Sequence, residues 1–346
     1  MIYALYTAEK RKTHFFDKEI EEIYQKIQAK IGNYEILLSS SSDDYSSFIL
    51  IAGSDRVEGN YYVYNTKNDH LELLSKSSPW LKEKDMAKMQ PIKFKSRDGL
   101  TIHGYLTIPL NKKPKNLPVI INPHPGPQWR NSWRFDPFTQ FFANRGYAVM
   151  QINFRGSEGY GKAFMRAGFK QWGLNMQDDI SDGVLWLIEQ GIADKDRIGI
   201  YGLSFGGYAA LAGITFTPEL YCCGVDLWGM TNYFTWYKSF PSRWKQYSEE
   251  IHSRWGDPVA DKEQMVATSP IFHVKKIKAP VFVVQSANDS RVKRQQSEEF
   301  IEELKKHKKE YEYVLLQGEG HALSNEKKII ELMGRLESFL EKHMKK

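Results

Sequence analysis

Residues 197–214, RIGIYGLSFGGYAALAGI, contain the stretch of sequence that decides the fold. Ile198–Tyr201 is a short apolar run that predicts a buried strand, and a helix is predicted near Gly207–Ile214. Between them, residues 202–206 read Gly-Leu-Ser-Phe-Gly and fit the pattern G-x-S-x-G. Glycines suit this pattern because so sharp a strand-to-helix turn leaves no room for side chains. The turn predicts Ser204 as a nucleophile at the carboxyl end of a sheet; the alternative is a glycine-rich turn that matches by chance.

The surrounding sequence predicts an α/β fold. From Ile92 onward, apolar runs of strand length alternate with stretches of helical periodicity, which indicates a mostly parallel sheet covered by helices on both faces. An antiparallel hairpin is expected first, formed by Ile92–Lys95 and Leu100–Ile108 around a Gly-containing turn. Further strands are predicted at Val119–Asn122, Ala148–Ile152, Ile198–Tyr201, Gly224–Leu227, Val281–Val284 and Tyr313–Leu316. Helices are predicted near Phe138–Asn144, Met176–Gln190, Gly207–Ile214, Gln295–His307 and Lys327–Lys342.

Residues 1–85 differ from the rest and predict a small N-terminal domain, followed by a larger domain over residues 86–346. A helix is expected over Asp17–Gly32, where isoleucines recur at helical spacing and Asp17 is suited to the N-cap. Short strands separated by Ser, Asp, Asn and Gly clusters are typical of antiparallel hairpins. Such strands are predicted at Glu35–Ser39, Phe48–Ala52, Tyr61–Tyr64 and Leu71–Leu74. This helix and hairpin region is too small for a large core, so we expect it to pack on the main domain.

Composition and charge argue against several classes of protein. The 346 residues are 41% hydrophobic and 26% charged, which is ordinary for a globular protein. No apolar run reaches the roughly 18 residues of a membrane-spanning helix, so no membrane partner is expected. The net charge of +6 is a mild excess, and the basic cluster near Lys305 lacks interleaved aromatic residues, so no nucleic acid partner is expected. No secretory signal is visible, and the adjacent Cys222 and Cys223 favour a cytoplasmic location over a disulfide framework.

A serine nucleophile needs a general base, and in this type of fold the acid and the histidine follow the serine at the ends of later strands. Among nine histidines, His321 alone lies in a loop directly after the last predicted strand. The strand Val281–Val284 is followed by one carboxylate, Asp289, which would accept the imidazole N–H and fix its tautomer. Asp226, at the end of the preceding strand, is a weaker alternative. The competing interpretations are a surface histidine and a turn-capping aspartate.

An oxyanion hole needs two donors where negative charge develops. One is the backbone N–H of Phe205, the residue after the serine. The other is expected from the loop after Val119–Asn122, which reads Pro-His-Pro-Gly-Pro at 123–127. Since proline has no N–H, only His124 and Gly126 can donate from the backbone there, and Gly126 permits the closer approach of a substrate. The alternative is a stiff proline turn whose amides face solvent.

Several segments together resemble the prolyl oligopeptidase family of serine peptidases, nearest to its acylaminoacyl-peptidase-like branch. In the family's order they are RDGLTIHGYLTIP at 97–109, HPGP at 124–127, NFRGSEGYGKAF at 153–164, GLSFGGY at 202–208, NDSRV at 288–292 and GEGHAL at 318–323. The resemblance implies an α/β-hydrolase fold with an eight-stranded sheet, and no cofactor or metal. It also implies Ser204 as nucleophile, Asp289 as acid and His321 as base, with Gly126 and Phe205 in the oxyanion positions.

The sequence departs from the family's pattern in two places. The family usually reads His-Gly-Gly-Pro where this chain has His-Pro-Gly-Pro, although Gly126, the glycine whose amide counts, is kept. Members usually carry a large β-propeller, and here residues 1–85 resemble only its last blade, so we expect a reduced member or a fragment of a longer one. Nothing matches the paired glutamates of the dipeptidyl-peptidase relatives, which leaves that activity without support from the sequence.

Aromatic residues are 14% of the chain and gather after the serine. An apolar acyl pocket is predicted from these rings; the alternative is core packing or an interface. Its members would be Trp129, Trp133, Trp228, Tyr233 and Trp236. Arg155, a hallmark of the family, is interpreted as a structural arginine that pairs with carboxylates or carbonyls near the site, with a substrate carboxylate anchor as the alternative.

These residues predict a serine hydrolase that cleaves peptide or acyl-ester bonds through an acyl-enzyme intermediate, most simply an oligopeptidase or acylaminoacyl-peptidase-like enzyme. The expected partner is a small peptide or acyl-ester substrate, and the N-terminal region is a candidate surface for a homo-oligomer. One alternative is a carboxylesterase with little peptidase activity. An alternative of a different class is a catalytically silent hydrolase fold that serves as a binding module.

Overall fold

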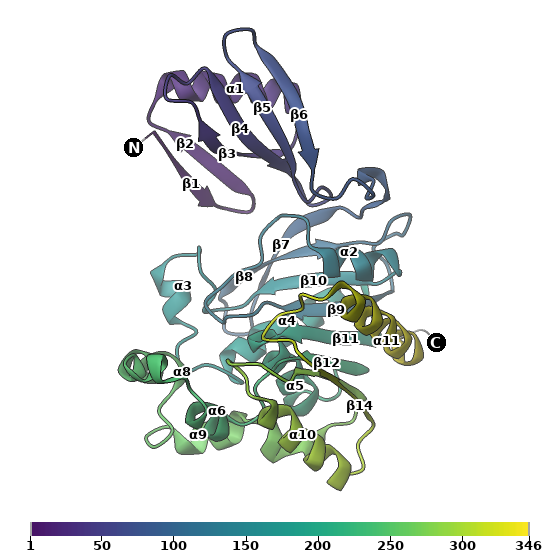
Figure 1. Ribbon diagram of the computed structural model, residues 1–346. Coiled ribbons are helices and arrows are strands. Elements are labelled where there is room, and N and C mark those ends of the chain that lie inside the picture. Colours follow the sequence, from purple (N-terminus) through teal and green to yellow (C-terminus); the bar gives the residue numbers. More distant parts are fainter. Residues whose placement is uncertain (1, 345–346) are drawn as a thin grey trace. The chain divides into compact units, whose positions relative to one another are not determined.

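The computed structural model describes residues 2–344 of the chain. The chain divides into two compact units (Figure 1). The first takes the residues up to 91 together with 105–112 and 132–147, and the second takes 92–104, 113–131 and the chain from 148 onward. Most strands of the large sheet, and every residue predicted as nucleophile, acid or base, belong to the second unit.

The first unit is built on a four-stranded antiparallel sheet. Its strands follow one another in space as β3 (Glu35–Ser41), β4 (Ser47–Gly53), β5 (Asn60–Asn65) and β6 (His70–Lys76). Before them come a hairpin of β1 (Tyr3–Thr7) and β2 (Arg11–Phe15), and the helix α1 (Lys18–Ile31). This unit also contains η1 (Glu83–Asp85) and α2 (Pro137–Asn144).

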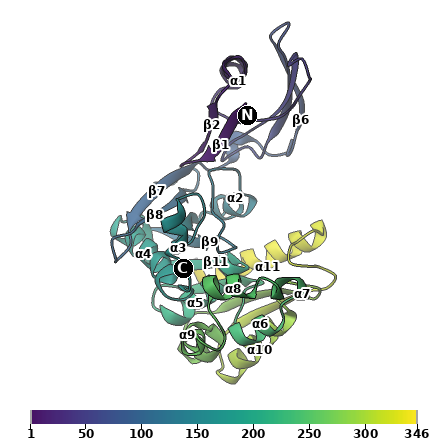
Figure 2. The ribbon, with the colours of Figure 1, turned by 90° about the vertical axis from the view of Figure 1, so that its left-hand side faces the viewer.

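Helix α1 and the sheet form two layers, which Figure 2 shows side by side. The Asp17 carboxylate caps the helix by accepting the backbone N–H groups of Glu19 and Ile20, as expected for an N-cap aspartate. The isoleucines at helical spacing face the sheet and are buried there. This core consists of Ile20, Ile23, Ile27, Ile36, Phe48, Leu50, Ala52 and Tyr64.

The second unit holds most of an eight-stranded sheet with the order β14-β13-β12-β11-β9-β10-β8-β7. Its pairs from β10 through β9, β11, β12 and β13 to β14 are parallel. The strands are β7 (Met89–Lys95), β8 (Thr101–Thr107), β9 (Leu117–Pro123), β10 (Ala148–Asn153), β11 (Ala193–Leu203), β12 (Cys223–Leu227), β13 (Val281–Ser286) and β14 (Tyr311–Leu316). Every residue of β10, β12 and β13 is buried, which is typical of a parallel sheet covered on both faces.

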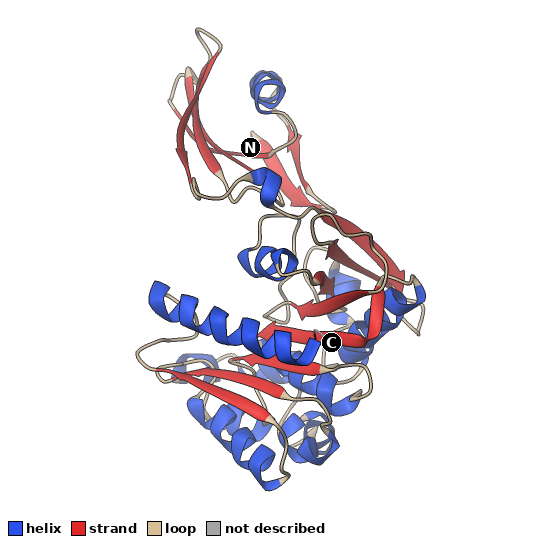
Figure 3. Cartoon of the chain, turned by 90° about the vertical axis from the view of Figure 1, so that its right-hand side faces the viewer, coloured by secondary structure: helices blue, strands red, loops and turns tan. Residues whose placement is uncertain are grey.

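Helices connect these strands. They are α3 (Lys162–Arg166), α4 (Asn175–Glu189), α5 (Phe205–Phe216), α6 (Tyr233–Lys238), α7 (Ser242–Lys245), α8 (Ser248–Trp255), α9 (Lys262–Thr268), η2 (Pro270–Lys276), α10 (Arg294–Lys306) and α11 (Glu326–Met344). Figure 3 shows α11 as the long helix that runs beside the strands.

The alternation of side chains along β11 explains why both faces are covered. A Cβ added to Gly199 would lie 2.9 Å from the sulfur of Met344, so this residue faces α11. A Cβ added to Gly213 on α5 would lie 3.2 Å from the Cδ1 of the next residue of the strand, Ile200, so that side chain faces α5. Because successive residues of a strand point to opposite faces, α11 and α5 lie on opposite sides of the sheet. This is the α/β-hydrolase arrangement that the sequence predicts.

Candidate active site

Ser204 lies at the junction of β11 and α5 with φ 55° and ψ −116°, a left-handed conformation that non-glycine residues rarely adopt. Its own N–H donates to the carbonyl of Leu227 at 2.8 Å, which fixes the turn. A Cβ on Gly202 would come within 2.1 Å of the backbone of Gly206, and a Cβ on Gly206 within 2.3 Å of the Pro123 carbonyl oxygen. The two glycines of the pattern are therefore required by contacts with backbone.

Ser204, His321 and Asp289 form one hydrogen-bonded line. The Ser204 Oγ lies 2.9 Å from the His321 Nε2, and the His321 Nδ1 lies 2.6 Å from an oxygen of Asp289. Since a carboxylate only accepts, the Nδ1 carries the proton and the Nε2 is free to accept from the serine hydroxyl. The imidazole is 12% exposed and the Asp289 side chain 0%. The structure thus brings together the three residues that the sequence proposes as nucleophile, base and acid.

Asp289 is held by its own loop. Its second oxygen accepts the backbone N–H groups of Arg291 at 2.8 Å and of Val292 at 2.9 Å. These bonds aim the other oxygen at His321. Asp226, the alternative acid, is buried elsewhere at the end of β12, where it accepts the N–H of Gly229 at 2.7 Å. Burial raises the pKa of Asp226 to about 7.

The loop after β9 lies beside the first turn of α5, as the contact between Gly206 and Pro123 shows. Phe205 is the first residue of α5, and the first N–H groups of a helix have no acceptor within it. Gly126 has φ 129°, and a Cβ there would lie 2.9 Å from the nitrogens of Gln128 and Trp129. The two amides proposed for the oxyanion hole thus belong to segments that touch each other.

The His124 side chain fastens this loop. Its Nε2 lies 2.7 Å from the Ser157 hydroxyl and its Nδ1 lies 2.7 Å from the Pro125 carbonyl, while the ring stacks on Phe154. Burial lowers the pKa of His124 to about 4, so the imidazole is neutral. Because a carbonyl only accepts, the Nδ1 donates to Pro125 and the Nε2 carries no proton. The single hydrogen of the Ser157 hydroxyl lies between two acceptors, this Nε2 and the Phe154 carbonyl, each 2.7 Å from the hydroxyl oxygen.

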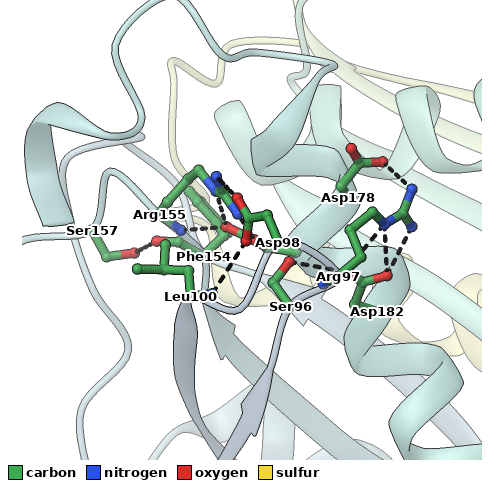
Figure 4. Close-up of polar contacts among 10 residues, drawn as sticks. Ser96, Arg97, Asp98, Leu100, Phe154, Arg155, Ser157, Asp178 and Asp182 are labelled. Carbon is green, nitrogen blue, oxygen red and sulfur yellow. Dashed lines mark hydrogen bonds and ion pairs between the residues drawn. The ribbon is translucent and has the colours of Figure 1, made fainter.

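Arg155 is paired with carboxylates, as the structural interpretation expects (Figure 4). Its guanidinium makes a two-point contact with Asp179 of α4, at 2.8 and 2.7 Å, and donates to Asp98 at 2.7 Å. A second pair lies beside it, in which Arg97 contacts Asp182. The Arg155 and Asp179 side chains are only 6% and 0% exposed. Arg155 therefore joins the segment after β10 to α4 and to the β7–β8 turn. Both of its carboxylate partners are protein side chains, which favours the structural interpretation over a substrate carboxylate anchor.

The aromatic residues predicted for an acyl pocket do not share one environment. Trp129 is 61% exposed, whereas Trp228, Tyr233 and Trp236 are 2–4% exposed. Trp133 belongs to the first unit, where it donates to the Met89 carbonyl and packs in a buried cluster. The low exposure of these four rings favours core packing, the alternative considered from the sequence.

Sequence reasoning missed Trp172, which forms the centre of the aromatic cluster. Its ring contacts those of Phe205, Tyr208, Tyr233, Trp236 and Trp255. Phe205 directly follows Ser204, so this cluster packs against the turn that carries Ser204. No local motif marks Trp172, and its partners come from three separate segments of the chain, α5, α6 and α8.

Within residues 2–344 no group of three or more His, Cys, Asp or Glu side chains is arranged to hold a metal ion. In the same part of the chain, no helix is long and apolar enough to cross a membrane.

An eight-stranded, mostly parallel sheet with a serine on a sharp turn after its central strand defines an α/β-hydrolase. The sequence profile of the prolyl oligopeptidase family matches residues 133–346. The chain belongs to this family of serine peptidases.

Two curated relatives extend the match. Dipeptidyl aminopeptidase BIII of Pseudoxanthomonas mexicana is 34% identical over 317 residues, covering 89% of this chain and 46% of its own length. Dipeptidyl peptidase family member 6 of Caenorhabditis elegans is 30% identical, covering 97% of this chain and 52% of its own. The chain thus spans about half the length of these relatives. Among solved structures, Pyrococcus horikoshii acylaminoacyl peptidase has the same fold, with a TM-score of 0.81 at 23% identity, over 99% of this chain and 54% of its own.

Proposed function

We propose that this chain is a serine peptidase in which Ser204 is the nucleophile, His321 the general base and Asp289 the acid. The observation that carries the proposal is the unbroken line of hydrogen bonds from Asp289 through His321 to the Ser204 hydroxyl. A serine hydroxyl is a weak nucleophile unless a base takes its proton as it attacks. The His321 Nε2 is oriented to do this, and Asp289 stabilises the imidazolium that results.

The proposed reaction has two stages. Ser204 attacks the substrate carbonyl, and the negative charge that forms on oxygen is held by the amides of Phe205 and Gly126. His321 then gives its proton to the leaving group, and the acyl group remains on Ser204. A water molecule deprotonated by His321 attacks the carbonyl of the acyl-enzyme. The ester bond to Ser204 then breaks, His321 returns the proton to the Ser204 oxygen, and the acid product leaves. The chemistry needs only the side chains and backbone of the protein.

The substrate class follows from the relatives. Both curated relatives described above are named for dipeptidyl peptidase activity, and the solved structure for acylaminoacyl peptidase activity. We therefore propose that the chain removes short units, unblocked or acylated, from the amino ends of peptides. This proposal includes dipeptidyl peptidase activity, which the sequence alone did not support. Trp129, which is 61% exposed, is the predicted pocket residue most accessible to a substrate.

The test combines covalent labelling with a panel of substrates. A fluorophosphonate should modify the wild-type chain at Ser204, located by mass spectrometry, and should leave Ser204→Ala unmodified. Turnover is then compared for a dipeptide anilide, an acyl-amino-acid anilide and a p-nitrophenyl acyl ester. An active chain that cleaves only the ester would establish the carboxylesterase alternative. A wild-type chain that is neither labelled nor active would establish the silent binding module and refute the proposal.

Three further parts of the proposal concern the whole protein. Residues 1–85 are proposed to correspond to one propeller blade, because β3–β6 form a four-stranded antiparallel sheet. The same region is proposed as the contact of a homo-oligomer. A cytoplasmic site of action is proposed because the adjacent Cys222 and Cys223 suit a reducing compartment better than a disulfide framework.

A further inference from the structure

The loop that carries His321 contains a buried carboxylate that the proposed reaction does not use. Glu319 lies two residues before His321, between β14 and α11, and is 3% exposed. A buried charged group costs free energy unless it is paired and hydrogen-bonded. The partners of Glu319 therefore indicate what its burial achieves.

Both carboxylate oxygens of Glu319 have partners. One accepts the backbone N–H of Ser324 at 3.2 Å and the Ser324 hydroxyl at 2.9 Å. The other accepts from the Lys328 ammonium at 3.1 Å, which also donates to the carbonyl of Gln317. The hydrogen bonds from Ser324, followed by that from Lys328, hold the pKa of Glu319 below its usual range. The carboxylate thus ties the start of the loop to its far end and to the first turn of α11.

The backbone of Glu319 makes a second connection. Its carbonyl accepts the N–H of Asn288 at 3.0 Å, and Asn288 directly precedes Asp289. The loop of the base and the loop of the acid are therefore joined at Glu319. His321 lies between the two anchored positions, Glu319 on one side and Ser324 on the other.

We propose that Glu319 is a positioning residue that holds the His321 imidazole on the line between Asp289 and Ser204. The inference rests on the proposed function, because it assigns Glu319 to the same reaction. Without the carboxylate, the loop loses charge-assisted hydrogen bonds at its far end, and the imidazole is no longer confined between its two partners. A displacement of about 1 Å in a reacting group lowers a rate by roughly 100-fold.

Glu319→Gln is the sharpest variant, because it keeps the size of the side chain but sets an amide NH₂ against either the Ser324 N–H or the Lys328 ammonium. We expect kcat per active site to fall by roughly 10- to 100-fold with KM changed by less than about twofold, since an interaction that orients the base acts on the chemical step. The matched control is Glu326→Gln, which changes an exposed glutamate in the first turn of α11. It should keep the wild-type kcat.

The measurement separates positioning from a loss of folded protein. Active sites are counted by the burst of p-nitrophenol from an acyl ester, and kcat is expressed per counted site. A merely structural role of Glu319 would reduce the number of sites and leave kcat per site unchanged. Lys328→Met provides a second variant that keeps the carboxylate and removes one partner, and we expect it to lower kcat per site by a smaller factor, about threefold to tenfold.

The inference is overturned if Glu319→Gln, or Lys328→Met where the first variant does not fold, has the wild-type kcat per site. This outcome differs from a failure of the proposed function. In the first case the wild-type chain is labelled at Ser204 and hydrolyses substrate while the variants match it. In the second, the wild-type chain itself is neither labelled nor active, and Glu319 then has no base to position.

Discussion

Asp226 makes a quantitative prediction about stability and pH. Burial at the end of β12 raises its pKa from 3.8 to about 7, because the charged form is poorly solvated there. The unfolded chain releases this proton near its ordinary value. Between those two values the folded state therefore binds more protons than the unfolded state, and the free energy of unfolding falls as the pH rises. The contribution is fully present below the lower pKa and is lost as the pH passes through the upper one.

The magnitude follows from linkage. Between about pH 5 and about pH 7 the carboxyl of Asp226 is protonated in the folded chain and ionised in the unfolded chain. Over these two pH units the free energy of unfolding falls by about 1.36 kcal/mol per unit, and it changes little from there to pH 8, so the total loss is about 2.6 kcal/mol. Asp226→Asn retains an oxygen that can accept the Gly229 N–H but cannot ionise. Relative to wild type, the variant should therefore become more stable by about 2.6 kcal/mol between pH 5 and pH 8.

The assay is urea unfolding followed by tryptophan fluorescence at both pH values, for wild type, Asp226→Asn and the control Asp43→Asn, which changes an exposed carboxylate. Other titrating groups cancel because only the difference between wild type and variant is used. If the difference between wild type and Asp226→Asn is the same at both pH values to within about 0.5 kcal/mol, Asp226 is ionised in the folded state throughout and the reasoning is wrong.

Three other substitutions and one control test the site and its supports. Arg155→Met should lower the free energy of unfolding by about 3–5 kcal/mol in thermal or urea unfolding, because it leaves the Asp179 carboxylate buried without its cation. Gly202→Ala places a Cβ 2.1 Å from the backbone of Gly206 and should abolish fluorophosphonate labelling, whereas Gly334→Ala, in open space on α11, should stabilise the chain by about 1 kcal/mol. Gly126→Ala keeps the amide N–H, but its Cβ would lie 2.9 Å from the next backbone nitrogens at φ 129° and so displace that amide. We expect kcat to fall by roughly 100- to 1000-fold in the ester assay, the range for loss of an oxyanion donor; an unchanged kcat would remove Gly126 from the oxyanion hole.

The sequence predicts best those features that depend on local chain geometry. The turn at Ser204 is one, because its glycines are set by backbone contacts within a few residues and with the neighbouring strand. The buried parallel strands are another, because each is a continuous apolar run. Asp289 and His321 follow such strands directly, so the order of the strands brings them to one edge of the sheet without any knowledge of packing.

The features that the sequence did not reveal depend on packing between distant segments. The strand Arg11–Phe15 was not predicted, since its residues are mostly polar and none is buried. The helices α6 to α9 lie in a segment where aromatic residues obscure helical periodicity. The positions of Trp172 and Trp236 follow from the rings that they meet, and that of Trp133 from its cluster with Met89 and Tyr105. A tryptophan in a core has the same local sequence signal as one in a pocket.

The departure at position 125 shows which part of a motif is physically required. Gly126 adopts φ 129° and lies so close to the next backbone amides that a side chain would collide with them. Position 125 needs neither a positive φ nor the absence of a side chain. Its part in holding the loop is its carbonyl, which accepts the His124 Nδ1–H. Proline supplies a carbonyl as well as glycine does and lacks only an N–H, which this contact does not use. Proline at position 125 is therefore compatible with this loop. The backbone conformation requires glycine only at position 126, and the hydrogen bond from His124 requires only the carbonyl of residue 125.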